Sequence, residues 1–183
     1  MEEAKADVSL VCLNSKSHKF IFENDDSFEE DEIDEFVSKF LKNKLKPTYK
    51  SEIEPKNNAN KLVKVFVGST IGTVLEKNKD KDVVVYFHQK YCNGCDEFDS
   101  LYSKLAKHFA KSKNLLFGKL NTDNNEYPEE FQSNSNQPAL FIRKANTNIP
   151  QLFDYNKDAT LEDLINFIDK KAVEQKSSDK QEL

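Results

Sequence analysis

Two cysteines separated by two residues, Cys92 and Cys95, are the side chains of this sequence best suited to covalent chemistry. They follow a short apolar run, 83–87, that predicts a buried strand, and they open a stretch, 93–111, that predicts an amphipathic helix. Unpaired amides and the macrodipole at a helix N-terminus stabilise anions, so Cys92 can ionise below the free-thiol pKa of about 8.5 and act as the nucleophile. Cys95 lies one turn further along the same face and can act as the resolving thiol.

Two other roles for the cysteine pair remain open from the residues alone. A CxxC pair supplies two of the roughly four ligands that zinc needs, but the sequence has no second pair, and its three histidines, His18, His88 and His108, are scattered. The pair can also be a permanent structural disulfide or an inert buried pair. The order strand, CxxC, helix within an α/β pattern favours a redox site that needs no metal or other cofactor.

Length and composition limit the classes of protein that the chain can be. At 183 residues it has room for one ordinary domain and part of another. Its 27 Lys and Arg residues against 32 Asp and Glu residues give a net charge of −5, which offers no basic field for a phosphate backbone. The longest clearly apolar run, 83–87, is far shorter than the ~20 residues that cross a bilayer. We therefore expect neither nucleic acid as a partner nor insertion into a membrane.

The elements that must position the cysteines alternate between strand and helix from residue 62 onward. The expected strands are 62–67, 83–87, 115–120, 139–143 and 151–155, and the expected helices are 69–78, 93–111, 124–131 and 161–171, the last of them capped by Thr160. Residues 1–46 predict a hairpin and one helix, which are too small to enclose a core. We divide the chain into this fragment, a polar linker at 47–61, an α/β domain at 62–172 and a tail at 173–183 that we expect to be disordered.

This order of elements around Cys92-Asn93-Gly94-Cys95 resembles the thioredoxin fold, and residues 62–173 resemble the last catalytic domain of a protein disulfide isomerase. Residues 36–47, 51–55 and 63–68 are similar to the junction between that family's non-catalytic substrate-binding domain and its last catalytic domain. The resemblance implies an α/β thioredoxin-like fold with a central mixed sheet flanked by helices. It also implies that residues 1–46 are the last hairpin and helix of a second thioredoxin-like domain.

The resemblance implies roles for residues outside the cysteine pair. Gln137 and Pro138 match a substrate-binding loop in which a cis-proline faces the cysteines and an extended substrate pairs with the backbone. Lys119 matches a lysine that the family places behind the active site. Arg143, the last residue of the predicted strand 139–143, is expected at the surface.

The chain departs from the family at several active-site positions. Asn93 and Gly94 replace the usual Gly-His, which predicts a weaker oxidant, and Tyr91 replaces the usual Trp. Tyr86 stands where the family has a buried Glu that accepts the proton of the resolving thiol.

His88 and Lys90 stand just before the cysteines and are candidates to supply part of the lost cationic character. The alternative is that both are solvent-facing loop residues.

We therefore predict a thiol–disulfide oxidoreductase and isomerase that forms, reduces or reshuffles disulfides through Cys92 and Cys95. The expected partners are glutathione and unfolded or misoxidised secretory proteins. The alternative is a redox-weak chaperone or peptide-binding module of the same fold.

Two features of the sequence bear on where the protein works. Lys180-Gln181-Glu182-Leu183 resembles a signal for retrieval to the endoplasmic reticulum. Residues 1–14 lack the basic start and apolar stretch of a signal peptide. We therefore expect a protein of the endoplasmic reticulum lumen, of which this chain is a part.

Overall fold

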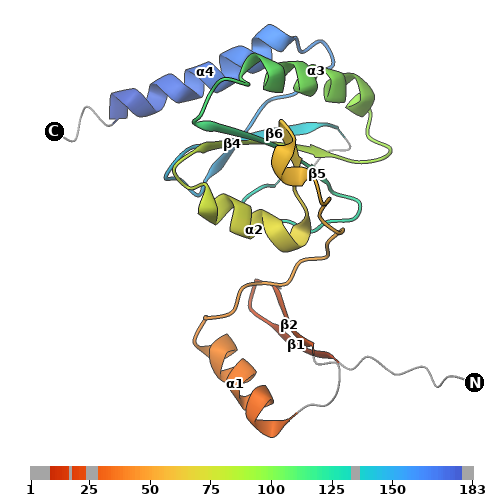
Figure 1. Ribbon diagram of the computed structural model, residues 1–183, viewed down its shortest axis with the longest axis vertical. Helices are drawn as coiled ribbons and strands as arrows, with labels where there is room; N and C mark the ends of the chain where they lie inside the picture. The colour runs from red at the N-terminus through yellow and green to blue at the C-terminus, as the bar shows by residue number, and fades with distance from the viewer. Residues whose placement is uncertain (1–8, 17, 24–28, 133–136, 179–183) are drawn as a thin grey trace, which may run out of the picture. The chain divides into compact units, whose positions relative to one another are not determined.

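The computed structural model describes residues 9–16, 18–23, 29–132 and 137–178, and Figure 1 shows their helices and strands. These residues form two compact units that divide between Tyr49 and Lys50, inside the segment predicted as a linker. The four residues of the predicted retrieval signal, 180–183, lie outside the described residues.

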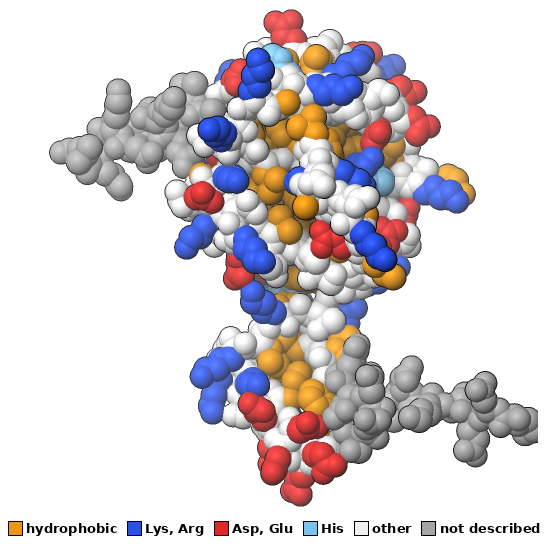
Figure 2. Space-filling view, viewed as in Figure 1, with side chains coloured by type: hydrophobic (Ala, Val, Ile, Leu, Met, Phe, Trp, Pro, Cys, Tyr) orange, Lys and Arg blue, Asp and Glu red, His pale blue; other side chains and the backbone are white. Residues whose placement is uncertain are grey.

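The first unit is a β-hairpin followed by one helix. Its elements are β1 (Ser9–Leu13), β2 (Lys19–Glu23) and α1 (Glu30–Leu41), and the two strands pair antiparallel. The rings of Phe20 and Phe40 meet edge to face at 5.2 Å. Three acidic side chains occupy the first turn of α1, and the acidic surface there is visible in Figure 2. Among the described side chains of this unit only Phe20 and Phe36 are buried, which is little for an independent core.

The second unit contains a five-stranded mixed sheet with the strand order β3-β5-β4-β6-β7. Its strands are β3 (Val63–Val65), β4 (Asp82–His88), β5 (Leu115–Asn121), β6 (Ala139–Arg143) and β7 (Pro150–Leu152). The central strand β4 pairs parallel with β5 and antiparallel with β6. The predicted mixed sheet of a thioredoxin-like fold is therefore confirmed. A parallel pair needs a crossover, and here the crossover contains the helix that follows the cysteines.

Helices cover both faces of this sheet (Figure 1). They are α2 (Gly68–Lys77) on one face and α3 (Cys95–His108) together with α4 (Leu161–Ser178) on the other. Residues 83, 85 and 87 of β4 pack toward α2, whereas residues 84 and 86 pack toward α3 and α4. Burial on both faces explains why this strand is a continuous apolar run rather than an alternating one.

Residues 124–131, predicted as a short helix, form turns and irregular backbone instead. The cause is Asn125, which is only 2% exposed and binds backbone from other parts of the chain. Its Oδ1 accepts the N–H groups of Glu52 and Gly68, both at 2.9 Å. These hydrogen bonds hold the loop in a shape that a helical hydrogen-bond ladder would not allow.

The last helix begins as predicted but ends later. The Thr160 Oγ1 accepts the backbone N–H of Asp163 at 3.2 Å, which confirms the predicted cap. α4 continues to Ser178, past the predicted end at Lys171 and into the segment expected to be disordered. Ala, Glu, Gln and Lys in that stretch favour a helix. No described helix, α4 included, is long and apolar enough to cross a membrane.

Gly118 of β5 generates a stability prediction, because the ring of Phe66 packs directly on its backbone. A Cβ at this position would lie 2.2 Å from a carbon of that ring, which is buried. We expect Gly118→Ala to lower the free energy of unfolding by roughly 1–3 kcal/mol through overpacking. The matched control is Gly72→Ala in α2, where a Cβ meets nothing within 4 Å; it should raise the same quantity by about 0.5–1 kcal/mol. Urea denaturation measures both, and equal stability of the two variants would contradict the close approach.

Candidate redox site

Cys92 and Cys95 form a disulfide at the junction of β4 and α3. Cys92 lies in the turn after β4, Cys95 is the first residue of α3, and their Cα atoms are 5.4 Å apart. Cys92 is half-buried, whereas Cys95 is only 8% exposed. A substrate therefore reaches the sulfur of Cys92 more readily, and the sulfur of Cys95 is sheltered. Among the described residues no group of three or more His, Cys, Asp and Glu side chains is placed to hold a metal ion.

The residues between the cysteines are shaped by a tyrosine from a distant part of the chain. Gly94 has φ 83°, a left-handed conformation that favours glycine. A Cβ there would also lie 2.6 Å from the hydroxyl oxygen of Tyr155. The ring of Tyr155 meets that of Phe98 edge to face at 5.3 Å. Sequence reasoning missed Tyr155, because only folding brings it beside the cysteine loop. The other residue between the cysteines, Asn93, is exposed.

Tyr86 lies beneath the cysteine pair and is 1% exposed. Its hydroxyl donates a hydrogen bond to the backbone carbonyl of Cys95 at 3.2 Å. Burial, together with the negative charges of Asp99 and Asp96, raises the pKa of this phenol well above its ordinary value. Tyr86 is therefore a neutral hydrogen-bond donor at physiological pH.

Lys119 extends from β5 beside Tyr86 and pairs with a carboxylate on α3. Tyr86 and Lys119 are direct neighbours in the parallel register of β4 and β5. The Lys119 Nζ lies 2.9 Å from Oδ1 of Asp99, and both side chains are partly exposed. Asp99 was not among the predicted site residues, although its position four residues after Cys95 was a usable signal, since residues i and i+4 are neighbours on a helix.

His88 is the last residue of β4, and its ring centroid lies 5.5 Å from that of Tyr86. Burial lowers the pKa of His88, and the positive charge of Lys119 lowers it further. Asp99, Asp123 and Glu52 oppose this shift without reversing it. The imidazole is therefore mainly neutral near pH 7, where it adds little positive charge beside the cysteines.

Lys90 and Tyr91 lie in the turn between His88 and Cys92. The backbone N–H of Lys90 donates to the Asp123 carboxylate at 2.7 Å. The Lys90 Nζ lies 5.2 Å from the centroid of the Tyr91 ring, and Tyr91 is 86% exposed. The turn thus presents an aromatic ring to solvent directly before the cysteine that a substrate reaches.

Gln137 and Pro138 lie at the same end of the sheet as the cysteines. They precede β6, whose first residue, Ala139, stands opposite Phe87 near the end of β4. Gln137 is exposed and Pro138 is buried. The expected cis peptide bond before Pro138 is wrong, because the bond is trans in the structure; trans is the isomer that X–Pro bonds favour intrinsically.

A segment of the predicted linker braces the turn that carries the cysteines. The Glu52 carboxylate accepts hydrogen bonds from the side-chain amides of Asn124 (2.8 Å), Asn125 (2.9 Å) and Asn121 (3.3 Å), and these bonds lower its pKa. The same loop donates the backbone N–H of Thr122 to the His88 carbonyl at 2.9 Å. Sequence reasoning missed this brace, because its partners lie some seventy residues apart along the chain.

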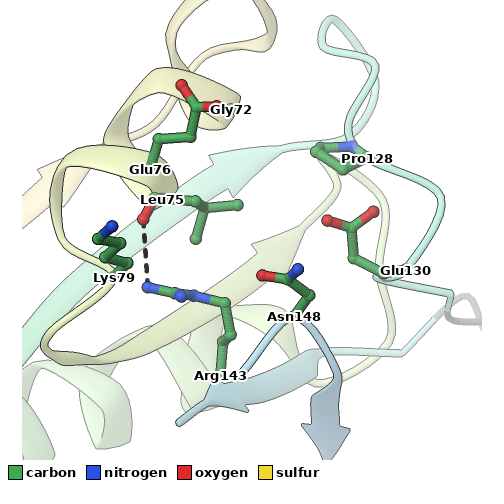
Figure 3. A pocket seen from close by; sticks show the side chains of 8 residues that line it. All are labelled: Gly72, Leu75, Glu76, Lys79, Pro128, Glu130, Arg143 and Asn148. Atoms are coloured by element: carbon green, nitrogen blue, oxygen red, sulfur yellow. Dashed lines mark hydrogen bonds between the residues drawn. The ribbon is translucent and has the colours of Figure 1, made fainter. Parts of the chain in front are cut away.

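A pocket shown in Figure 3 lies at the opposite end of β6 from the cysteines. The expectation that Arg143 is a surface residue is wrong, since it lines this pocket and is 4% exposed. Its guanidinium donates to the backbone carbonyls of Asn78 at 2.9 Å and Thr147 at 3.1 Å. These bonds tie the end of α2 to the turn between β6 and β7, whereas the buried Nε of Arg143 has no hydrogen-bond partner among the described residues. Burial lowers the pKa of Arg143.

The environment of His88 predicts how stability depends on pH. Because the folded state lowers the pKa of His88, the unfolded chain binds its proton more tightly. The contribution of neutral His88 to the free energy of unfolding is therefore complete above the ordinary histidine pKa of about 6.5. It is lost as pH falls toward the lowered pKa of the folded state. We expect His88→Gln to reduce the loss of unfolding free energy between about pH 7.5 and about pH 5. Urea denaturation at several pH values in this range measures the change in unfolding free energy. The control is His108→Gln, at the exposed end of α3, and an equal effect of this variant would show that His88 is not the cause.

The comparisons with known proteins agree with this geometry. The thioredoxin family model matches residues 62–170. The chain is 32% identical over 173 residues to protein disulfide-isomerase A4 of Homo sapiens and 31% identical over 183 residues to that of Mus musculus, which covers 94% and 100% of the chain. It is 30% identical over 162 residues, or 88% of the chain, to a protein disulfide-isomerase of Drosophila melanogaster.

These alignments cover 26%, 28% and 32% of the three relatives, so the chain spans between a quarter and a third of their length. The thioredoxin match covers more than half of the chain itself and includes both cysteines. The chain therefore belongs to the thioredoxin family, and within it to the protein disulfide-isomerases.

Proposed function

We propose that the second unit of this chain is a thiol–disulfide oxidoreductase and isomerase whose redox pair is Cys92 and Cys95. The observation that carries the proposal is their disulfide at the start of α3, with one accessible and one sheltered sulfur. The protein disulfide-isomerases among the relatives support it. No cofactor is required, since the two sulfurs carry the electrons.

We assign different steps to the two cysteines, and the greater exposure of Cys92 supports this assignment. The Cys92 thiolate attacks one sulfur of a substrate disulfide, a bond forms between Cys92 and that sulfur, and the second substrate sulfur leaves as a thiolate that takes up a proton. A substrate thiol can then attack the mixed disulfide, which reshuffles the substrate and restores Cys92. Alternatively, Cys95 attacks the sulfur of Cys92, which closes the protein disulfide and releases a reduced substrate. The reverse sequence oxidises a substrate dithiol.

The surroundings of the pair suit an extended polypeptide. Tyr91 and Gln137 are exposed at the cysteine end of the sheet, and Pro138 lies buried next to Gln137. We assign the two exposed side chains, with the backbone at Pro138, to substrate contact. Lys119 does not contact the substrate in this proposal; it positions the Asp99 carboxylate on the helix that begins at Cys95.

The proposed substrates are unfolded or misoxidised secretory proteins, the proposed small-molecule partner is glutathione, and the proposed compartment is the endoplasmic reticulum lumen. Kinship with the protein disulfide-isomerases supports all three.

We also propose that residues 1–46 are the end of a non-catalytic thioredoxin-like domain, joined through 47–61 to the catalytic domain at 62–172. The first unit buries only two of its described side chains. It exposes Val11, Leu13 and Leu41 by 48%, 61% and 72%, apolar surface that the rest of such a domain would cover.

Substitution of single cysteines tests the proposed function. We expect Cys92→Ser to reduce the reactivation of scrambled ribonuclease to the uncatalysed rate, because the nucleophile is lost. Cys95→Ser should accumulate mixed disulfides on Cys92, visible by mass spectrometry, because the resolving thiol is lost. The matched control is Cys12→Ser, in the first unit, which should leave turnover unchanged.

A different result would favour the chaperone or peptide-binding alternative. That function would be indicated if the parent protein showed no thiol turnover and the Cys92→Ser/Cys95→Ser double variant suppressed client aggregation as well as the parent does.

The residues around the pair predict a weakly oxidising disulfide. Asn93 and Gly94 are uncharged, and His88 is mainly neutral near pH 7. We therefore expect a reduction potential below the ~−180 mV of protein disulfide isomerase and closer to the ~−270 mV of thioredoxin. Equilibration in glutathione buffers, followed by alkylation and mass measurement, gives the value. A potential at or above ~−180 mV would show that other groups compensate for the missing histidine.

A further inference from the structure

Closure of the Cys92–Cys95 disulfide needs a group that takes the proton of the Cys95 thiol. The thiolate, not the thiol, attacks sulfur, and burial disfavours the charged form of a thiol. Cys95 is only 8% exposed, so bulk water has little access to it. A proton acceptor supplied by the protein would accelerate this step.

Two of the polar groups around Cys95 cannot fill this role. Tyr86 contacts the Cys95 carbonyl, but it is a protonated phenol whose pKa is raised by burial. Lys119 is a cation with donors only. His88, at the end of β4, is mainly neutral and remains a competing acceptor.

Asp99 is a carboxylate one helical turn after Cys95. Residues at i and i+4 of a helix have Cβ atoms about 5–6 Å apart and lie on one face. The Lys119 Nζ holds Asp99 Oδ1 at 2.9 Å, and Oδ2 has no hydrogen-bond partner among the described residues. The charge of Asp99 acts on both Tyr86 and His88, which places it within the group of polar side chains beneath the cysteines. It is half-exposed, so a proton that it accepts can pass on to solvent.

We propose that the Asp99 carboxylate, positioned by Lys119, accepts the proton of the Cys95 thiol when a mixed disulfide on Cys92 is resolved. The proposal rests on the redox function proposed above. Cys95 gives its proton to Asp99, and the resulting thiolate attacks the Cys92 sulfur. The bond between Cys92 and the substrate breaks, and its electron pair leaves with the substrate sulfur. The substrate thiolate takes up a proton from Asp99 or from water. Over attack and resolution together, the protein dithiol loses two electrons and becomes a disulfide, and the substrate disulfide gains them and becomes two thiols.

A proton acceptor and a simple charge effect predict opposite results for Asp99→Asn. If Asp99 acted only through its charge, its removal would ease the ionisation of Cys95 and would leave the positive charge of Lys119 without its carboxylate, so resolution would be faster. If Asp99 accepts the proton, its removal slows resolution. The other titratable groups facing this region are Asp96 and Glu97 on α3, Tyr86 and His88 on β4, Lys119 on β5 and Tyr155 after β7.

The experiment follows resolution separately from attack. The protein is prepared as a mixed disulfide between Cys92 and glutathione, and glutathione release is timed by acid quench and mass spectrometry as a function of pH. We expect Asp99→Asn to slow release at pH 7 by about tenfold to a hundredfold, as for loss of a general base. The deficit should shrink as pH rises beyond the free-thiol pKa of about 8.5, because hydroxide can then remove the proton of the buried Cys95 thiol without the carboxylate. Formate should partly restore release in Asp99→Ala, which a purely structural role of the side chain would not allow.

Matched variants separate this proposal from its alternatives. Asp96→Asn makes the same change of charge next to Cys95 on the exposed side of α3, and it should change release by less than twofold. Release that is unchanged or faster in Asp99→Asn overturns the proposal, as does slowing in His88→Gln but not in Asp99→Asn. Attack of reduced Cys92 on glutathione disulfide is measured in the same proteins. Failure of that attack in the parent overturns the proposed function, whereas normal attack with unaffected resolution in Asp99→Asn overturns only the role of Asp99.

Discussion

The packing of α3 against the central strand β4 is the contact on which the rest of the site depends. The ring of Tyr86 lies 5.0 Å from that of Phe98 and 5.3 Å from that of Tyr102, and all three residues are no more than 1% exposed. The Tyr102 hydroxyl lies within hydrogen-bond distance of backbone carbonyls of both β4 and β5, at 2.9 and 2.7 Å. Buried aromatic groups packed in this way contribute strongly to stability. They fix the first turn of α3, and with it Cys95, at the end of β4.

The same contact determines where charge can reside near the cysteines. Tyr86 occupies the buried position beneath Cys95 as a neutral phenol, and it donates to the Cys95 carbonyl. A carboxylate at this depth would carry a large desolvation cost. The carboxylate that pairs with Lys119 lies instead on α3, at the partly exposed Asp99. The ion pair next to Tyr86 is therefore formed with the helix that begins at Cys95.

The turn that carries the cysteines is held from its other side by polar side chains of the linker region. Glu52 accepts hydrogen bonds from three asparagine side chains, one at the end of β5 and two in the loop after it, and that loop in turn binds the His88 carbonyl and the Lys90 N–H. Residues that resemble a flexible connection by composition thus belong to the second unit.

The sequence by itself determined the strand, the CxxC pair and the helix, and the order of the remaining elements. Those features follow from local apolar patterns and spacing, which a single segment carries regardless of its neighbours. The tertiary structure alone decided the irregular loop around Asn125, the burial of Arg143 and the position of Tyr155 beside Gly94. Each of these depends on hydrogen bonds or packing between segments that are distant along the chain, so no local pattern can reveal it.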